Sequence, residues 1–201
     1  MLKIGLTGGL ACGKSFVGER LAEWGCFLIH ADDLGHEVLT PAGEAYDAVI
    51  REFGRDILNG EEQIDRALLA QRVFGAPERL ARLNALVHPA VWRRVERLAA
   101  EFASRDPHGI VVMEAAILIE TGNYKRFDRI VLVTCREEQQ VERAMRREGS
   151  TEADVRARLS RQMPLEEKRK YAQFVIDTSG EKEDTVRQTR AVYETLRRIA
   201  S

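Results

Sequence analysis

The sequence is poor in cysteine, in aromatic residues and in long apolar segments. Its 201 residues include three cysteines, with no Cys-x-x-Cys pair and no histidine partner at metal-ligand spacing. This scarcity excludes a disulfide-stapled scaffold and a zinc ribbon, and it favours a reducing, cytoplasmic setting. The apolar run at residues 4–13 is short and rich in glycine. It predicts neither a membrane-spanning helix, which needs about 20 apolar residues, nor a secretory signal.

An excess of charge of one sign is also missing. The 31 Lys and Arg residues face 32 Asp and Glu residues, and aromatic residues make up 6% of the chain. Without a basic field or a stacking motif, nucleic-acid binding is not expected, and any anion site must be local. Hydrophobic residues make up 44% and charged residues 31% of the chain, as in an ordinary globular protein. The length suits a single domain, residues 1–201.

Short β-branched segments alternate with amphipathic helical patterns along the chain. The expected strands are Leu2–Thr7, Phe27–Ala31, Ile110–Ala115, Arg129–Thr134 and Phe174–Asp177. The expected helices are Lys14–Glu23, Ala42–Phe53, Arg66–Phe74, Pro77–Ala103, Glu137–Glu148, Glu152–Arg161 and Glu183–Ile199. This alternation predicts an α/β fold with a parallel five-stranded sheet.

Two helical regions interrupt this core, which we expect at about residues 1–32, 109–135 and 172–201. Residues 33–108 contain helix signals without a convincing strand, and they predict a helical insert. Pro89 lacks a backbone donor and disfavours helical geometry at His88, so two helices should meet there. Residues 136–171 carry many charges of both signs, and they predict a mobile helical hairpin that acts as a lid.

A phosphate-binding motif follows the first expected strand. The segment GGLACGKS matches GxxxxGK[ST] and leads directly into a helix, which is the context that a P-loop requires. Its small residues let backbone N–H groups surround phosphate oxygens, and the helix adds the positive end of its dipole. The expected nucleotide-binding residues are Gly8, Gly9, Leu10, Ala11, Cys12, Gly13, Lys14 and Ser15. A glycine-rich turn that matches by chance is the alternative.

The two polar residues of the motif predict a magnesium nucleotide as ligand. Lys14 would contact the β- and γ-phosphates, and the Ser15 hydroxyl would ligate Mg²⁺. Glu114, at the end of the third expected strand, would hold the metal through water or would bond a neighbouring loop instead. Cys12 lies at a helix N-terminus that can lower a thiol pKa. It is either redox-sensitive or a small residue that fits.

A pair of aspartates follows the second expected strand. No NKxD guanine-recognition segment occurs, which disfavours a regulatory GTPase. Asp32 stands where open α/β sheets place their ligands, and it would orient an acceptor hydroxyl and take its proton. The alternative is helix capping, which Asp33 would perform for a helix that starts near Leu34.

The ordered segments GLTGGLACGKS, IHADD, DRALLAQRVF, LNALVHPAV, AILIETG and FVIDTSG resemble the motifs of dephospho-CoA kinase over nearly the entire chain. The resemblance implies a P-loop kinase-type three-layer sandwich with a helical acceptor-binding insert and a helical lid. It implies transfer of the ATP γ-phosphate to the ribose 3′-hydroxyl of dephospho-CoA, with Asp32 as the catalytic aspartate. Arg66, His88 and Glu120 would bind the acceptor, although His88 could equally be a histidine packed at a helix end.

The resemblance also places phosphate-binding arginines in the lid. Arg143 and Arg147 are spaced i, i+4 on one helix face, where like charges cost stability unless an anion lies between them. We expect Arg143 to stabilise the transferring phosphoryl group together with Lys14, and Arg147 to bind the nucleotide. The alternative is a solvated helix whose arginines are balanced by Glu142 and Glu148.

Five positions depart from the family pattern. Ala11 and Cys12 occupy variable places in the loop, and Ala11 requires an ordinary backbone conformation where glycine is commoner. His30 replaces an acid, Ala116 replaces a proline, and Thr178 replaces an asparagine in a loop that approaches the adenine. Another P-loop kinase for a nucleoside monophosphate or small molecule remains an alternative, as does a nucleotide-dependent switch.

Overall fold

The computed structural model describes residues 1–201, apart from the side chain of Glu148. The chain forms two compact units. The first contains Met1–His30 and Phe102–Ser201, and the second contains Ala31–Glu101. The second unit overlaps the range 33–108 that the helix signals marked as an insert.

A parallel sheet of five strands organises the first unit, in the order β2-β3-β1-β4-β5. The strands are β1 (Leu2–Gly8), β2 (Phe27–His30), β3 (Ile110–Glu114), β4 (Arg129–Thr134) and β5 (Phe174–Asp177). This confirms the predicted α/β fold. All strands point the same way, so their carboxyl ends lie along one edge, where parallel sheets bind ligands.

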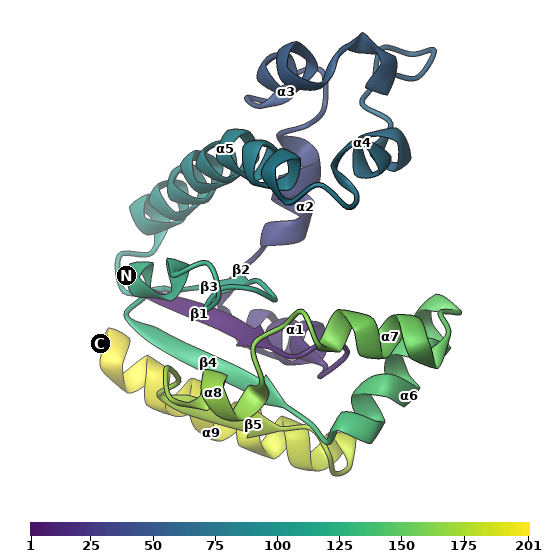
Figure 1. Cartoon of the computed structure of the whole chain (residues 1–201). Helices are drawn as coiled ribbons and strands as arrows, with labels where there is room; N and C mark the ends of the chain where they lie inside the picture. Colours follow the sequence, from purple (N-terminus) through teal and green to yellow (C-terminus); the bar gives the residue numbers. More distant parts are fainter. The chain divides into compact units, whose positions relative to one another are not determined.

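Two helices, α1 (Lys14–Glu23) and α9 (Lys182–Ala200), pack together on one face of the sheet (Figure 1). Alternate residues of β1, Leu2, Ile4 and Leu6, point to this face and join a buried cluster with Leu21 and Leu196. The β-branched and leucine-rich strand sequences suit burial on both faces, which is why they lack a polar side.

The opposite face of β1 packs against residues 116–127, which include the 3₁₀ turn η2 (Asn123–Arg126). A Cβ atom on Gly5 would lie 2.5 Å from Leu118 and 3.2 Å from Phe127, so glycine allows this close approach. On β2, the Phe27 ring stacks on the ring of Phe102, with 5.0 Å between the ring centroids. Phe102 is the residue at which the chain re-enters the first unit.

Three helices occupy the region predicted to be a lid: α6 (Glu137–Glu148), α7 (Glu152–Leu159) and α8 (Leu165–Arg169). Gly149 ends α6 with a positive φ of 63°, and the Thr151 hydroxyl caps α7. Buried Ala144 and Val155 pack α6 against α7. The sequence patterns missed α8, because five charge-rich residues make too short a helix to show a period.

The second unit contains α2 (Ala31–Glu37), α3 (Tyr46–Phe53), η1 (Arg55–Ile57), α4 (Arg66–Val73) and most of α5 (Pro77–Arg105). The prediction of two helices meeting at His88 and Pro89 is wrong, because α5 runs through Pro89 without a break. Proline removes one internal hydrogen bond from the helix. Burial of Ala90, Val91, Val95 and Ala99 after the proline favours one continuous helix.

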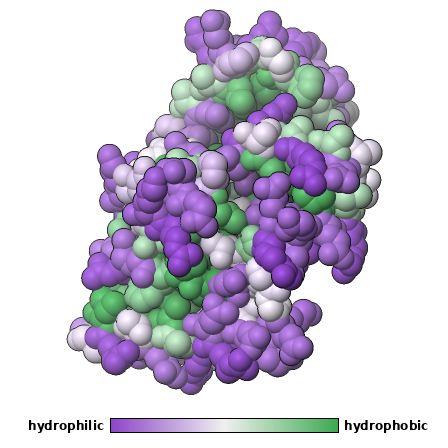
Figure 2. Space-filling model, turned by 60° about the horizontal axis from the view of Figure 1, so that its bottom comes forward, coloured by the Kyte–Doolittle hydropathy of each residue, from purple (hydrophilic) through white to green (hydrophobic). Residues whose placement is uncertain are grey.

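Hydrophilic residues dominate the face of the molecule shown in Figure 2, and hydrophobic residues appear there in smaller patches between them. Among the helices of the described residues, none is long and apolar enough to cross a membrane.

Candidate functional site

The loop between β1 and α1 has the backbone conformation of a cradle. Gly13 has a φ of 80° and directly precedes α1, which has no side-chain cap on its first turn. Ala11 has a φ of 53°, so the expectation of an ordinary conformation at this residue is wrong. A left-handed residue with a Cβ costs roughly 1–2 kcal/mol, which the surrounding loop contacts must offset. The loop therefore leaves the first N–H groups of α1 able to bind an anion.

Lys14, the first residue of α1, points back over this loop. Its Nζ donates a hydrogen bond to the carbonyl oxygen of Gly9 at 3.0 Å. This contact holds the ammonium group above the cradle, where it can reach the outer phosphates of a nucleotide.

Two neighbouring strands, β2 and β3, place His30 and Glu114 beside Ser15 on α1. The Ser15 hydroxyl donates to Glu114 Oε1 at 2.9 Å, and His30 Nδ1 lies 2.9 Å from Glu114 Oε2. The sheet register sets this arrangement, because His30 and Leu6 both lie opposite Glu114 in adjacent strands. His30, noted as a departure from the family pattern, thus contacts the same carboxylate. A hydroxyl and a carboxylate at this distance suit Mg²⁺, which prefers oxygen ligands.

Arg143 on α6 reaches the loop after β5. Its Nη1 donates to the Thr178 hydroxyl at 3.0 Å, and its Nη2 donates to the Thr178 carbonyl at 2.8 Å. The Thr178 hydroxyl in turn donates to the Cys12 carbonyl at 2.9 Å. Arg143 is therefore linked to the P-loop through one buried threonine.

Arg147 lies one turn further along α6 and is exposed. Between these arginines, Arg146 pairs with Glu142 at 2.6 Å. Glu142, which was expected to balance Arg143 and Arg147, therefore pairs with Arg146. The side chain of Glu148, the other expected partner, lies outside the described residues.

Cys12 is buried in the P-loop against Cys135, which follows β4. The Cys135 thiol lies 3.3 Å from Cys12 Sγ and donates to it. This hydrogen bond lowers the pKa of Cys12, and the positive charge of Lys14 adds to the effect against the cost of burial. The same hydrogen bond and burial raise the pKa of Cys135. All three cysteines of the chain are free thiols.

Glu120 makes a contact that the sequence does not suggest. Its Oε1 lies 2.8 Å from Nζ of Lys168, a lysine on α8 whose side chain is 0% exposed. Its Oε2 is buried and accepts no hydrogen bond from the described residues. The run Glu-Glu-Lys-Arg-Lys that contains Lys168 is typical of a solvated surface. No pattern in the sequence singles out this one lysine.

The other expected site residues belong to the second unit and lie on three different helices. Asp32 and Asp33 are exposed in the first turn of α2, which begins at Ala31, so the expected helix start near Leu34, with Asp33 as its cap, is wrong. Arg66 is exposed at the start of α4, where Asp65 caps the helix. His88 is half-buried on α5, and burial lowers the pKa of its imidazole, which favours the neutral form.

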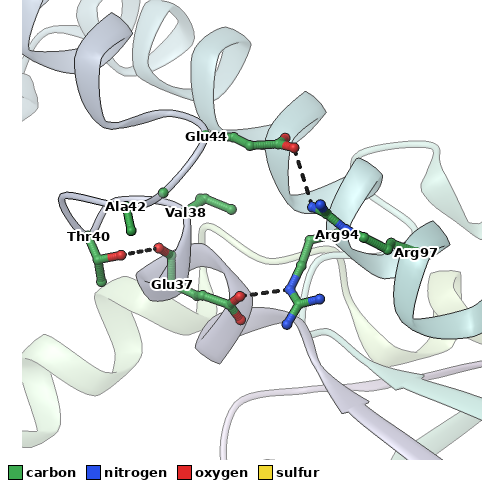
Figure 3. Close-up of a pocket in the computed structure, with 8 residues that line it drawn as sticks. Glu37, Val38, Thr40, Ala42, Glu44, Arg94 and Arg97 are labelled. Atoms are coloured by element: carbon green, nitrogen blue, oxygen red, sulfur yellow. Dashed lines mark hydrogen bonds and ion pairs between the residues drawn. The ribbon is translucent and has the colours of Figure 1, made fainter. Parts of the chain in front are cut away.

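A cavity of about 260 Å³ lies within the second unit, between the 37–44 segment and α5 (Figure 3). Arg94 donates to Glu37 at 2.7 Å, and Arg97 donates to Glu44 at 3.3 Å. Arg93 also binds Glu44 at 2.8 Å, and this hydrogen bond holds the pKa of Glu44 below its usual value. Each of these guanidinium groups is already paired with a carboxylate, so the cavity offers little free charge to an anionic ligand.

The chain resembles known proteins along almost its full length. The family model for dephospho-CoA kinase matches residues 2–184. The dephospho-CoA kinase of Aquifex aeolicus is 40% identical over 198 residues, covering 98% of this chain and 99% of the relative. That of Thermobifida fusca is 39% identical over 198 residues, covering 98% of each.

Two solved structures share the architecture. The crystal structure of TT1252 from Thermus thermophilus superposes with a TM-score of 0.80 at 36% identity, covering 97% of each chain. The dephospho-CoA kinase from Campylobacter jejuni superposes with a TM-score of 0.66 at 22% identity, covering 96% of each chain, and supports the fold. Because the family model matches residues 2–184, which are most of the chain, the chain belongs to the dephospho-CoA kinase family.

Proposed function

We propose that this protein transfers the γ-phosphate of ATP to the ribose 3′-hydroxyl of dephospho-CoA, giving CoA and ADP. The observation that carries the proposal is the uncapped N-terminus of α1 behind a P-loop, with Lys14 above it, in a chain of this family. Three free thiols agree with a reducing, cytoplasmic setting.

The P-loop, Gly8 to Ser15, would hold the nucleotide phosphates. Backbone N–H groups at the start of α1 would bind the β-phosphate, and Lys14 would exchange the Gly9 carbonyl for phosphate oxygens. Ser15 and Glu114 are the residues that would hold Mg²⁺, whose charge would offset that of the phosphates. His30 would orient the Glu114 carboxylate.

Asp32 would accept the proton of the attacking 3′-hydroxyl and align its oxygen with the γ-phosphorus. Arg143 and Arg147 would bind phosphate oxygens as charge moves toward the leaving ADP. Arg143 would give up its hydrogen bonds to Thr178 for this purpose.

Arg66, His88 and Glu120 would bind the acceptor. Glu120 has a buried oxygen, Oε2, free to accept a hydrogen bond, and the neutral form of His88 can both donate and accept one. In this scheme, residues 1–32, 109–135 and 172–201 form the nucleotide-binding core of a single kinase domain. Residues 33–108 receive the acceptor, and residues 136–171 close over the phosphates and exclude water.

The direct test measures ADP release from Mg-ATP by the purified chain. Dephospho-CoA is compared with AMP, CMP, UMP, shikimate and no acceptor, and the product mass is recorded. We expect rapid release with dephospho-CoA and a product heavier by one phosphoryl group. Activity with a different acceptor would show that dephospho-CoA is not the substrate. ADP release that needs no acceptor would favour a nucleotide-dependent switch.

Two neighbouring aspartates provide a matched pair of variants. Asp32→Asn should lower kcat about 10²- to 10⁴-fold, with ATP affinity retained, because it removes the proton acceptor and keeps the shape. Asp33→Asn changes the adjacent carboxylate, which is also exposed, and should leave kcat nearly unchanged. Equal effects of the two variants would contradict the role of Asp32.

Lys14→Ala should weaken both nucleotide binding and transfer.

A further inference from the structure

Lys168 is the one lysine among the described residues with a fully buried side chain. Lysine is almost never buried without partners, because removing an ammonium group from water is costly. Its helix, α8, is otherwise charged and mostly exposed. The neighbouring Lys170 shows the ordinary behaviour, with a side chain that is 65% exposed and paired with Glu167.

The Lys168 ammonium group has three donors and three oxygen partners. Nζ donates to the Ala116 carbonyl at 2.9 Å and to the Gly8 carbonyl at 3.4 Å, and it lies 2.8 Å from Glu120 Oε1. Gly8 is the first residue of the P-loop, whereas Ala116 and Glu120 belong to the segment after β3. One buried charge therefore joins α8 to the P-loop and to the segment after β3.

The segment that leads into α8 also contacts the P-loop. Gln162 Oε1 accepts a hydrogen bond from the Leu10 amide at 3.1 Å. Met163 donates its amide to Glu120 Oε1 at 3.2 Å. Residues 162–168 thus form a strap that contacts Gly8 and Leu10 on one side and Glu120 on the other.

Gly8 has little freedom to move away from this strap. A Cβ atom at Gly8 would lie 2.3 Å from the Val133 carbonyl on β4, which shows how closely the two backbones approach. The start of the P-loop is therefore held between β4 and Lys168. The Gly8 carbonyl and the Gly9 N–H share one peptide plane, so holding this carbonyl also sets the direction of the next amide of the loop.

We infer that Lys168 is a positioning residue for nucleotide binding, which holds the start of the P-loop in its phosphate-binding shape and is itself held by Glu120. It touches no substrate and acts through the Gly8 carbonyl. Its kinetic consequence rests on the proposed function, but its effect on ADP affinity does not depend on any acceptor.

The test measures the dissociation constant of ADP by titration calorimetry, without acceptor, for the full chain and its variants. Lys168→Met should weaken ADP binding about 10- to 100-fold, the range typical when an orienting contact is lost. Lys168→Arg keeps the charge and donors and should restore part of the affinity. Lys170→Met removes an exposed lysine two residues away and should bind ADP within about twofold of the unsubstituted chain.

A second variant guards against a Lys168→Met chain that does not fold. Glu120→Gln keeps the shape, removes the negative charge that holds Lys168 and should also weaken ADP binding. Because both residues act through one contact, the double variant should bind ADP no more weakly than Lys168→Met alone. Circular dichroism establishes which variants are folded.

Unchanged ADP affinity in a folded Lys168→Met or Glu120→Gln variant would overturn the inference, as would an equal loss in Lys170→Met. If the variants behave as expected but dephospho-CoA is not phosphorylated by the unsubstituted chain, the proposed function fails and the positioning role stands. If the unsubstituted chain does not bind ADP, both are overturned.

Discussion

Thr178 connects the P-loop to α6, and its hydroxyl can be removed with almost no change in shape. This side chain is 6% exposed. The hydroxyl donates to the Cys12 carbonyl at 2.9 Å, has the Thr134 carbonyl as a second acceptor at 3.2 Å, and accepts from Arg143 at 3.0 Å. Thr178→Val keeps the volume and loses these interactions.

The expected cost follows from what the substitution leaves behind. The buried Cys12 carbonyl loses a donor, and an unsatisfied buried polar group costs about 1–3 kcal/mol. The Arg143 guanidinium keeps its bond to the Thr178 carbonyl at 2.8 Å and is only half-buried, so water can replace the second bond. We therefore expect Thr178→Val to lower the free energy of unfolding by about 2 kcal/mol. For a chain of this length, that lowers the Tm by about 4–8 °C.

The assay is urea unfolding followed by circular dichroism, with ADP affinity measured on the same preparations. ADP affinity should fall as well, because the Cys12 carbonyl directly precedes the left-handed residue Gly13. Thr195→Val is the control, since the Thr195 hydroxyl donates to the Ala191 carbonyl in an exposed hydrogen bond within α9 and should contribute less than about 0.5 kcal/mol. A Thr178→Val chain as stable as this control would refute the reasoning.

Gly8→Ala places a Cβ atom 2.3 Å from the Val133 carbonyl, so we expect a stability loss of about 1–3 kcal/mol and weaker ADP binding; normal values for both would show that the backbones can separate. Burial lowers the pKa of His88, so the unfolded chain binds more protons than the folded one just below the ordinary imidazole value near 6.5. The free energy of unfolding in urea should therefore fall as the pH drops through that range, and His88→Gln should reduce this dependence on pH. If the variant and the unsubstituted chain depend on pH equally, burial of His88 is not the cause. Burial raises the pKa of Cys26 to about 12, so iodoacetamide should leave it unlabelled at pH 8 until urea unfolds the chain, as mass spectrometry can establish.

Local patterns were sufficient where they coincide with strong physical constraints. The five strands were predicted to within a residue at each end, because segments such as Ile110–Glu114 are buried on both faces and contain little else than apolar side chains. Helix α1 was predicted with its bounds, because the P-loop motif determines where it begins. The nucleotide-binding residues that we expect in the loop are contiguous in the chain, so a motif can identify them.

Local patterns failed where packing outweighs propensity. Pro89 predicted a break that α5 does not have, and Ala11 adopts a left-handed conformation that its Cβ disfavours. In each case contacts beyond the immediate neighbours offset a cost of a few kcal/mol, which no short sequence window records.

By itself, the sequence determined the fold class, the P-loop and the resemblance that names the acceptor, because these depend on periodicity and on residues close together in the chain. Only the tertiary structure decided which charges are buried and what they hold. Lys168 lies in a run of charged residues, yet it alone among them is enclosed, 160 positions from the Gly8 carbonyl that it contacts. Burial of a charge depends on surfaces that distant segments bring together, and the chemical identity of a lysine does not reveal it.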